Sequence, residues 1–428
     1  MPLLLVAMWP LSAWADASVI DVLAYRAEIT PDIANGSVRG EVSIRFTSRA
    51  DALAHVRFDR GALVIDGVFE GKTPLAFDTP PGVVETTPIR PLHKGEIRTI
   101  RIRYHGSPSY GLQFDPARRE TYTVFSTSQW LVCIDSPSER ASLDLTLLVS
   151  GDSTVAATGR LLSRRARDRG IVAHRWRLDR PAASFLYGFA VGPYRETRSA
   201  GARPRLRQLS INRTPEEIEK IFTGTRDILD FYADRAGVRY PNPEYTQVLV
   251  ADTIGQELAG LGFLSEDYGS QVLNDPDGIG LIAHEAAHQW WGDLVTCRDW
   301  GHFWLNEGFA TFMTAAYIEH RQGRAAYDQI VAGWQARIER LRQSGTNHPL
   351  VYAEWKKPSR DDRAVVYQKG AYILHLLREE LGEALFWKSI RDYTRTHAGT
   401  SVVTSDFRRA MERSSGRDLH LFFETWVE

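Results

Sequence analysis

The sequence predicts an α+β fold of two domains, a β-rich N-terminal domain followed by a domain of a small sheet and packed helices. Residues 18 to about 203 alternate apolar and polar side chains with a period of two, which is typical of strands. From about residue 277 onward the apolar residues recur at helical spacing. The 428 residues also exceed what one core usually organises. We therefore predict domains at 18–203 and 204–428.

Residues 1–17 are predicted to belong to neither domain. An apolar run precedes small residues at Ala13, Ala15 and Ala17, which is typical of a secretory signal peptide cleaved after Ala15 or Ala17. The run is too short to cross a bilayer comfortably. We expect an exported protein, periplasmic or secreted, without a stable membrane span. No Lys or Arg precedes the run, and a buried first strand is the alternative interpretation.

Within the N-terminal domain, the clearest strand patterns are 42–48, 97–106, 143–150 and 174–180, with Gly, Pro, Asp and Ser between them. Such a series of strands predicts a β-sandwich or an open, saddle-like barrel. The basic run 160–170 is interpreted as a solvated hairpin rather than a binding surface.

The second domain follows a polar linker at 196–205. Its first helix is predicted to begin after Thr214, with Pro215 in the first turn and Glu217 completing a capping box. A strand is predicted at 246–253. The remaining predicted helices are 278–291, 306–320, 325–343, 368–381, 384–396, 405–414 and 418–426.

Charge and cysteine content exclude some classes of function. The net charge of −1 provides no overall field that would attract nucleic acid, so we expect no nucleic-acid partner. Cys133 and Cys297, the two cysteines, form neither a disulfide framework nor a cysteine zinc motif.

A candidate metal motif lies at HEAAH, residues 284–288. On a helix, His284 and His288 lie one turn apart on one face, at a spacing that lets both imidazoles bind one zinc ion. Glu285 lies between them on the neighbouring side. The alternative is an ordinary helical histidine pair.

A catalytic zinc ion needs a third protein ligand and a position for water. The segment 292–301 carries Gly and Asp residues that let the chain turn back, and Asn306 is a suitable N-cap for the next helix. Glu307 would then face the two histidines. An acidic residue is also favoured at a helix N-terminus, and the two roles are compatible.

HEAAHQWWGD (284–293) and WLNEGFA (304–310) resemble the gluzincin zinc metallopeptidases of the membrane alanyl and puromycin-sensitive aminopeptidase type. The segments 130–147, 240–250 and 366–383 extend the resemblance across most of the chain. It implies a thermolysin-like catalytic domain, one zinc ion per chain and a peptide substrate.

The resemblance also implies individual roles. The zinc ligands would be His284, His288 and Glu307. Glu285 would be the general base that takes a proton from the attacking water. Tyr367 would donate its hydroxyl to the oxyanion. Asp293 and Asp299 are both candidates to orient the ligating imidazoles, and the sequence does not choose between them.

The strand that binds the substrate amine departs from the family pattern. In 256–267, Ala259 occupies the place of the family's glutamate and Gly260 that of its asparagine, while a one-step shift gives Gly262. None of these is acidic. Glu257 is two positions away, which on a strand returns to the same face, so it is the candidate anchor. Without an anchor, the enzyme would cut internally or take blocked substrates.

The sequence ends at FFETWVE, where larger relatives continue into a C-terminal helical domain, so we expect a short form with a more open cleft. The predicted function is an aminopeptidase with an altered amine-binding strand. The alternatives are an endopeptidase, another zinc hydrolase such as an epoxide hydrolase, and a catalytically silent binding scaffold. Metal analysis with a peptide assay distinguishes them.

Overall fold

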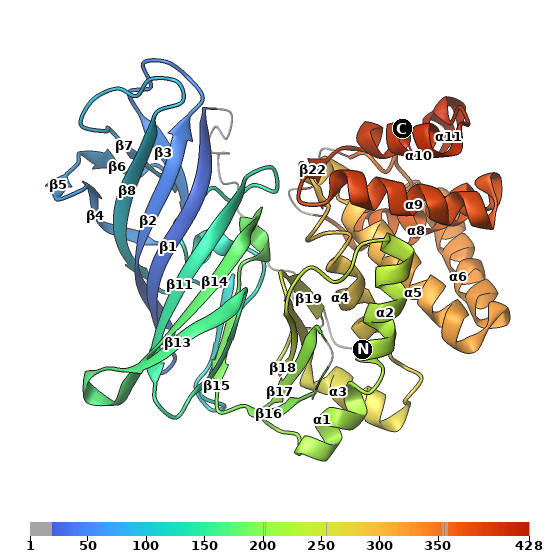
Figure 1. Cartoon of the computed structure of the whole chain (residues 1–428), viewed down its shortest axis with the longest axis horizontal. Helices are drawn as coiled ribbons and strands as arrows, with labels where there is room; N and C mark the ends of the chain where they lie inside the picture. Colours follow the sequence, from blue (N-terminus) through green and yellow to red (C-terminus); the bar gives the residue numbers. More distant parts are fainter. Residues whose placement is uncertain are drawn as a thin grey trace.

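The computed structural model describes residues 19–199, 201, 203–253, 255–352, 355 and 358–427. A β-rich N-terminal part lies beside a mainly helical C-terminal part (Figure 1). This arrangement confirms the predicted fold class. The predicted signal segment, 1–17, lies outside the described residues.

Three sheets make up the N-terminal part. Its strands are β1 (Ile20–Asp32), β2 (Ser37–Ser48), β3 (Val56–Gly61), β4 (Val64–Glu70), β5 (Thr73–Pro74), β6 (Phe77–Asp78), β7 (Gly82–Thr86), β8 (Ile97–Gly106), β9 (Leu112–Asp115), β10 (Glu120–Thr123), β11 (Arg140–Ser150), β12 (Thr154–Ala157), β13 (Arg160–Ala166), β14 (Ile171–Ala183) and β15 (Phe189–Gly192). The large sheet has the order β13-β14-β11-β1-β2-β8-β4-β5. The smaller sheets are β12-β15-β10-β9 and β3-β7-β6.

The pleat of these strands accounts for the period of two in the sequence. On β11, Leu143, Leu145 and Leu147 are buried while the residues between them are half-buried. Successive side chains on a strand point to opposite faces, so one face of the large sheet enters the N-terminal core. The basic run forms the hairpin β13–β14, and the side chains of β13 are exposed or half-buried, as predicted.

The C-terminal part holds one further main sheet, of order β16-β17-β18-β20-β19, and a set of helices. Its strands are β16 (Arg195–Arg198), β17 (Arg205–Ser210), β18 (Glu244–Val250), β19 (Gly255–Leu258), β20 (Leu261–Ser265), β21 (Thr296–Cys297) and β22 (Ser401–Val402). Its helices are α1 (Pro215–Ile221), α2 (Thr225–Ala236), α3 (Glu266–Asn274), α4 (Gly280–His288), α5 (Trp304–Gln322), α6 (Arg324–Gln343), α7 (Arg360–Ala364), α8 (Gly370–Leu381), α9 (Glu383–His397), α10 (Thr404–Ser415) and α11 (His420–Trp426). Strand β16 lies before residue 203, where the N-terminal domain is predicted to end, and it pairs with β17 of this sheet.

One face of this sheet packs against the N-terminal part. Tyr122 and Ala190 of the four-stranded sheet share a buried cluster with Val248, Leu258 and Phe263 of β18, β19 and β20. The helices cover the opposite face (Figure 1). The two parts are therefore joined through a common apolar core.

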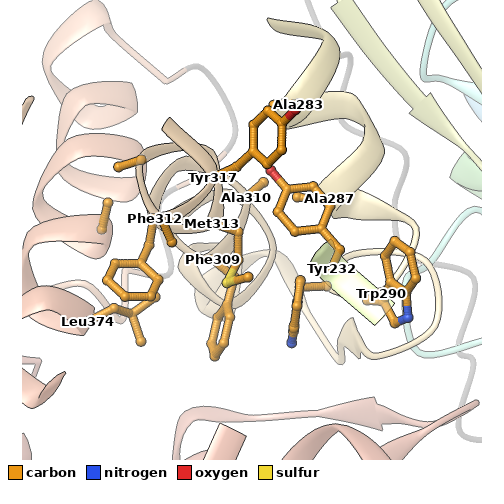
Figure 2. Packing of buried hydrophobic residues seen from close by; sticks show 14 of the residues in the cluster. Tyr232, Ala283, Ala287, Trp290, Phe309, Ala310, Phe312, Met313, Tyr317 and Leu374 are labelled. Carbon is orange, nitrogen blue, oxygen red and sulfur yellow. The ribbon is translucent and has the colours of Figure 1, made fainter. Parts of the chain in front are cut away.

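Helices α4 and α5 form the centre of the helical part. Figure 2 shows Ala283 and Ala287 of α4 in the same buried cluster as Ala310 and Met313 of α5. Small side chains let helix backbones approach closely, because little volume separates them. His284 and His288 directly follow Ala283 and Ala287 on α4, so this packing also brings the motif residues close to α5.

Most helix ends agree with the sequence, but Asn306 does not cap α5. The capping box of Thr214 and Glu217 is present. The 3-10 turn Trp300–His302 leads directly into α5, which begins at Trp304. Asn306 therefore lies inside the helix, and its Oδ1 accepts a hydrogen bond from the backbone of Cys297 at 2.9 Å.

Two expectations, one about disulfide bonds and one about a membrane span, can be compared with the described residues. Cys133 and Cys297 are both buried and free. Among the described residues, no helix is long and apolar enough to cross a membrane.

Candidate metal centre

Two imidazoles and one carboxylate converge between α4 and α5. The Nε2 atoms of His284 and His288 lie 3.2 and 3.4 Å from Oε2 of Glu307. The two Nε2 atoms are themselves 3.2 Å apart. The structure therefore brings together the three side chains that the sequence selected as metal ligands.

Helix geometry produces this convergence. His284 and His288 are four residues apart on α4, so they share one face. Glu307 lies in the first turn of α5 and is 2% exposed. Because α4 packs against α5, a first-turn side chain of α5 faces the histidine face of α4.

A backbone carbonyl orients His288. Its Nδ1 lies 3.1 Å from the carbonyl oxygen of Trp291, which accepts the Nδ1 proton and directs Nε2 toward Glu307. Gly292 allows the chain to turn there, since its φ is 136° and a Cβ would lie 2.8 Å from Nδ1 of His288. Asp293 instead accepts from Gln289, and Asp299 accepts from the backbone of Gly301.

The donor set fits a zinc ion. Ligand atoms about 2.1 Å from one ion at tetrahedral angles lie roughly 3.4 Å apart, close to the separations observed here. Two imidazole nitrogens and one carboxylate oxygen also match the composition of a catalytic zinc site with an open position. Burial favours the protonated form of Glu307, but His288 and His284 outweigh it and lower the pKa of this carboxyl. The carboxylate is therefore ready to act as a ligand.

Glu285 lies beside the metal ligands, and its Oε2 atom is not hydrogen-bonded to any described residue. The residue is 4% exposed, and Oε2 has no hydrogen-bond partner among the described residues. Burial raises the pKa of Glu285 well above its usual value, and the nearby His288 opposes this rise. A buried carboxyl with a free oxygen and a raised pKa suits a group that accepts a proton and returns it.

Space for Glu285 comes from a glycine that the sequence analysis did not single out. A Cβ at Gly255, the first residue of β19, would lie 2.2 Å from Oε1 of Glu285. No side chain fits there while Glu285 keeps its position. A glycine at the start of a strand pattern is a signal for such a close approach.

Tyr367 approaches the centre from a third element. It lies in the π-helical turn η5 (Val365–Lys369), between α7 and α8, and its ring stacks on His284 with centroids 5.9 Å apart. Burial and the carboxylate of Glu307 raise the pKa of Tyr367, so its hydroxyl keeps its proton. Isolated π turns are frequent at functional sites.

The backbones of α5 and η5–α8 are held together by two glycines. A Cβ on Gly308 would lie 3.0 Å from Cα of Gly370, and a Cβ on Gly370 would lie 3.1 Å from Cα of Gly308. These glycines follow Glu307 and Tyr367 in the sequence. Their close contact therefore fixes the approach of the tyrosine to the metal ligand.

Glu257 also reaches the centre. A carboxylate oxygen of Glu257, one of Glu285 and a ring nitrogen of His288 all lie within 4.8 Å of one another. Leu258, the next residue, packs in the core shared with the N-terminal part, so the strand's pleat directs Glu257 to the opposite, helical side. Glu257 is 3% exposed, and burial raises its pKa to about 7. Within the described part of the chain its Oε1 has no hydrogen-bond partner.

The other three candidates on this hairpin lie elsewhere. Ala259 packs against the N-terminal core and its backbone N–H donates to Leu186 at 3.1 Å. Gly260 completes the two-residue turn with a φ of 81°. Gly262 lies beneath Glu285, since a Cβ there would be 3.7 Å from Cβ of Glu285. The structure thus brings Glu257, rather than Ala259 or Gly260, to the metal-binding cluster.

Comparison with known proteins finds a matching family description and proteins of similar sequence. The description "Peptidase family M1 domain" matches residues 221–426. The chain is 27% identical to aminopeptidase N of Lactococcus lactis over 320 residues, which is 69% of this chain and 37% of that protein. It is 25% identical to aminopeptidase M1 of Arabidopsis thaliana, over 78% of this chain and 37% of that protein. The chain therefore spans just over a third of the length of these curated relatives.

Solved structures resemble the whole described fold. The M1 zinc metallopeptidase from Deinococcus radiodurans superposes with a TM-score of 0.82 at 24% identity, covering 97% of this chain and 94% of that chain. A mutant of that metallopeptidase bound to a Tyr-Ser-Ala substrate gives a TM-score of 0.82 at 25% identity, covering 96% of this chain and 94% of that chain. The arrangement of two parts seen here is therefore shared with these structures.

Proposed function

We propose that this chain, whose residues 221–426 match the peptidase family M1 domain, is a zinc-dependent aminopeptidase, which removes residues from the free N-terminus of peptides. His284, His288 and Glu307 would hold the zinc ion, one per chain. When bound, zinc supplies a Lewis acid that polarises the scissile carbonyl and lowers the pKa of water.

The chain's own residues supply the proton transfers. Oε2 of Glu285 takes a proton from the attacking water as the carbon–oxygen bond forms. The same carboxyl gives that proton to the nitrogen of the leaving amine as the carbon–nitrogen bond breaks. The hydroxyl of Tyr367 donates a hydrogen bond to the oxygen that gains negative charge.

The observation that carries the proposal of exopeptidase action is the free carboxylate oxygen of Glu257. Three buried carboxylates, from Glu257, Glu285 and Glu307, lie around one site. Burial disfavours the ionised form of Glu257, and the ammonium group of a peptide would supply the positive charge that favours it. A buried carboxylate without a partner is unfavourable, so it favours a ligand that brings a positive charge.

A matched peptide pair tests this proposal. The same fluorogenic peptide is supplied with a free and with an N-acetylated terminus, and kcat/KM is measured for both. We expect the free peptide to be preferred in wild type and the preference to disappear in Glu257→Gln, with the zinc content unchanged.

Glu219→Gln, on the exposed face of α1, is the matched control and should behave as wild type. Equal cleavage of both peptides by wild type would exclude the aminopeptidase assignment and indicate an endopeptidase. Hydrolysis that persists after complete removal of metal would exclude the zinc mechanism.

Export is the second part of the proposal. It is supported by the apolar run and the small residues Ala13, Ala15 and Ala17 near the start of the sequence. Expression of the full sequence in a bacterial host, fractionation and N-terminal mass analysis test it. We expect material outside the cytoplasm that begins at Asp16 or Ser18. An intact Met1 in a cytoplasmic fraction would contradict export.

A further inference from the structure

The side chain of Gln289, directly after the second histidine of the metal motif, uses all of its hydrogen-bonding capacity. Its Oε1 accepts from the backbone N–H of Gly260 at 2.9 Å and from the hydroxyl of Tyr240 at 3.3 Å. Its Nε2 donates to the carbonyl of Leu258 at 3.0 Å and to Oδ2 of Asp293 at 2.8 Å. A carboxamide offers two donors and two acceptor positions, so all four are occupied. The residue is fully buried.

These contacts join two elements of the site. Leu258 and Gly260 belong to the end of β19 and the turn after it, and β19 carries Glu257. Gln289 caps α4, which carries His284 and Glu285. Strand β19 lies at the edge of its sheet, beside α4 (Figure 1). The amide of Gln289 therefore supplies hydrogen bonds between the edge strand and the metal helix.

The other side of the same strand is bound to the N-terminal part. Ala259 donates its backbone N–H to the carbonyl of Leu186. The amide of Gln256 can bond the backbone of Thr123 and of Phe125 at 3.2 and 2.9 Å. The strand is thus held between the N-terminal domain and Gln289.

Hydrogen bonds also hold the loop that follows Gln289. Asp293 donates its backbone N–H to the carbonyl of His288 at 2.9 Å. Its own carbonyl accepts from Nη2 of Arg140 at 3.0 Å, and Nη1 of the same arginine donates to Thr296. Arg140 begins β11 of the N-terminal part. The partner of Gln289 is therefore fixed from across the domain boundary.

Glu257 has no hydrogen-bond partner at Oε1 in the described residues, so its backbone must determine where its carboxylate lies. We propose that Gln289 is a positioning residue that sets the distance between the carboxylate of Glu257 and the metal centre, and with it the preference for a free N-terminus. This inference rests on the proposed aminopeptidase function. Misplacement of a binding group by about 1 Å can reduce a rate by roughly 10²-fold.

The principal test is Gln289→Leu, which keeps the side-chain volume close to that of glutamine and removes all four hydrogen bonds. Zinc content, hydrogen exchange of peptides covering 255–265, and kcat/KM for the free and N-acetylated peptide pair are measured. We expect one zinc ion per chain and faster exchange in 255–265. The kcat/KM of the free peptide should fall by about 10²-fold, mainly through KM, while that of the acetylated peptide stays within a few-fold of wild type.

Gln343→Leu is the matched control, because Gln343 is exposed at the end of α6 and its side chain donates to Glu339, one turn earlier in that helix. It should leave both substrates unchanged. If Gln289→Leu does not fold, Gln289→Met replaces it: the side chain is unbranched like that of glutamine and also lacks all four hydrogen-bonding groups, so the same loss of selectivity is expected.

The two proposals fail in different ways. The ratio of the two substrates in wild type tests the aminopeptidase function, and the change of that ratio in the variants tests the role of Gln289. Equal loss on both substrates would show a general structural role and overturn the inference. An unchanged ratio of the two kcat/KM values in the variant, even with faster hydrogen exchange in 255–265, would also overturn the inference. Unchanged hydrogen exchange in that segment would overturn it as well.

Discussion

The metal centre and the strand β19 lie side by side, yet they are specified in different ways. His284 and His288 are held by the internal register of one helix, and Glu307 comes from the first turn of the helix packed against it. Glu257 depends on hydrogen bonds from residues far away in sequence, including Gln289 and Leu186. The first is a local arrangement, whereas the second is assembled from both domains.

The difference predicts that the two regions respond differently to mutation. Changes at the metal centre should remove chemistry for every substrate. Changes at the strand should alter which substrates are chosen.

Removal of the metal should abolish hydrolysis of both free and acetylated peptides. Chelation followed by added zinc should restore activity in wild type but not in His288→Ala. Zinc should also raise the stability of the wild-type apoprotein, by about 2.7 kcal/mol when free zinc is about 100 times its Kd. Thermal unfolding with and without zinc measures this. A His288→Ala variant that gained the same stability would contradict the assignment of this ligand.

The local arrangement explains why the metal centre could be predicted from sequence. A spacing of four residues on a helix fixes the geometry of two imidazoles without knowledge of the rest of the fold. The β-rich and helical parts could be predicted for the same reason, because the periods of two and 3.6 are properties of single elements.

The amine-binding strand could be predicted in this way only in part. Alignment placed Ala259 and Gly260 where the amine anchor was expected and left Glu257 as a candidate two positions away. Only the fold shows that Ala259 turns into the N-terminal core while Glu257 faces α4. The carbonyl of Trp291 was missed because a backbone group carries no residue signal. Gln289 was missed because its partners are backbone groups of a distant turn.

The variant Glu285→Gln should keep zinc and lose about 10²–10⁴-fold in kcat, because the amide has the same shape but cannot accept and return the proton. The loss should be equal for free and acetylated peptides, since Glu285 acts on the water rather than on the amine. Metal analysis and steady-state kinetics on the peptide pair check both points. A loss confined to the free peptide would assign Glu285 to amine binding instead.

Tyr367→Phe should lower kcat by about 10²–10³-fold, the effect typical of one lost oxyanion donor. The ring of Tyr367 stacks on His284, and phenylalanine preserves that contact, so zinc content should not change. The preference for a free terminus should also be unchanged. Wild-type turnover in this variant would mean that another group donates to the oxyanion.

Gly255→Ala connects the two regions, because this glycine belongs to β19 but makes room for Glu285. The new Cβ would lie 2.2 Å from Oε1 of Glu285, so the carboxylate must move. We expect kcat to fall by up to about 10²-fold for both peptides. An unchanged kcat would show that the position of Glu285 does not limit the reaction.

The smallest effects are expected from two further alanine variants, in which an added Cβ would meet Glu285 less closely or meet nothing. At Gly262, a Cβ would meet the hydroxyl of Tyr245 at 2.9 Å but stay 3.7 Å from Cβ of Glu285, so a few-fold change in kcat is expected. At Gly333, in α6, a Cβ meets nothing within 4 Å. Gly333→Ala should leave kcat unchanged and stabilise the protein by about 0.5–1 kcal/mol, because alanine loses less conformational freedom in a helix. Thermal unfolding and steady-state kinetics of the three variants, at Gly255, Gly262 and Gly333, measure these effects. If Gly262→Ala lowered kcat as much as Gly255→Ala does, the strand, and not the carboxylate of Glu285, would be the sensitive element.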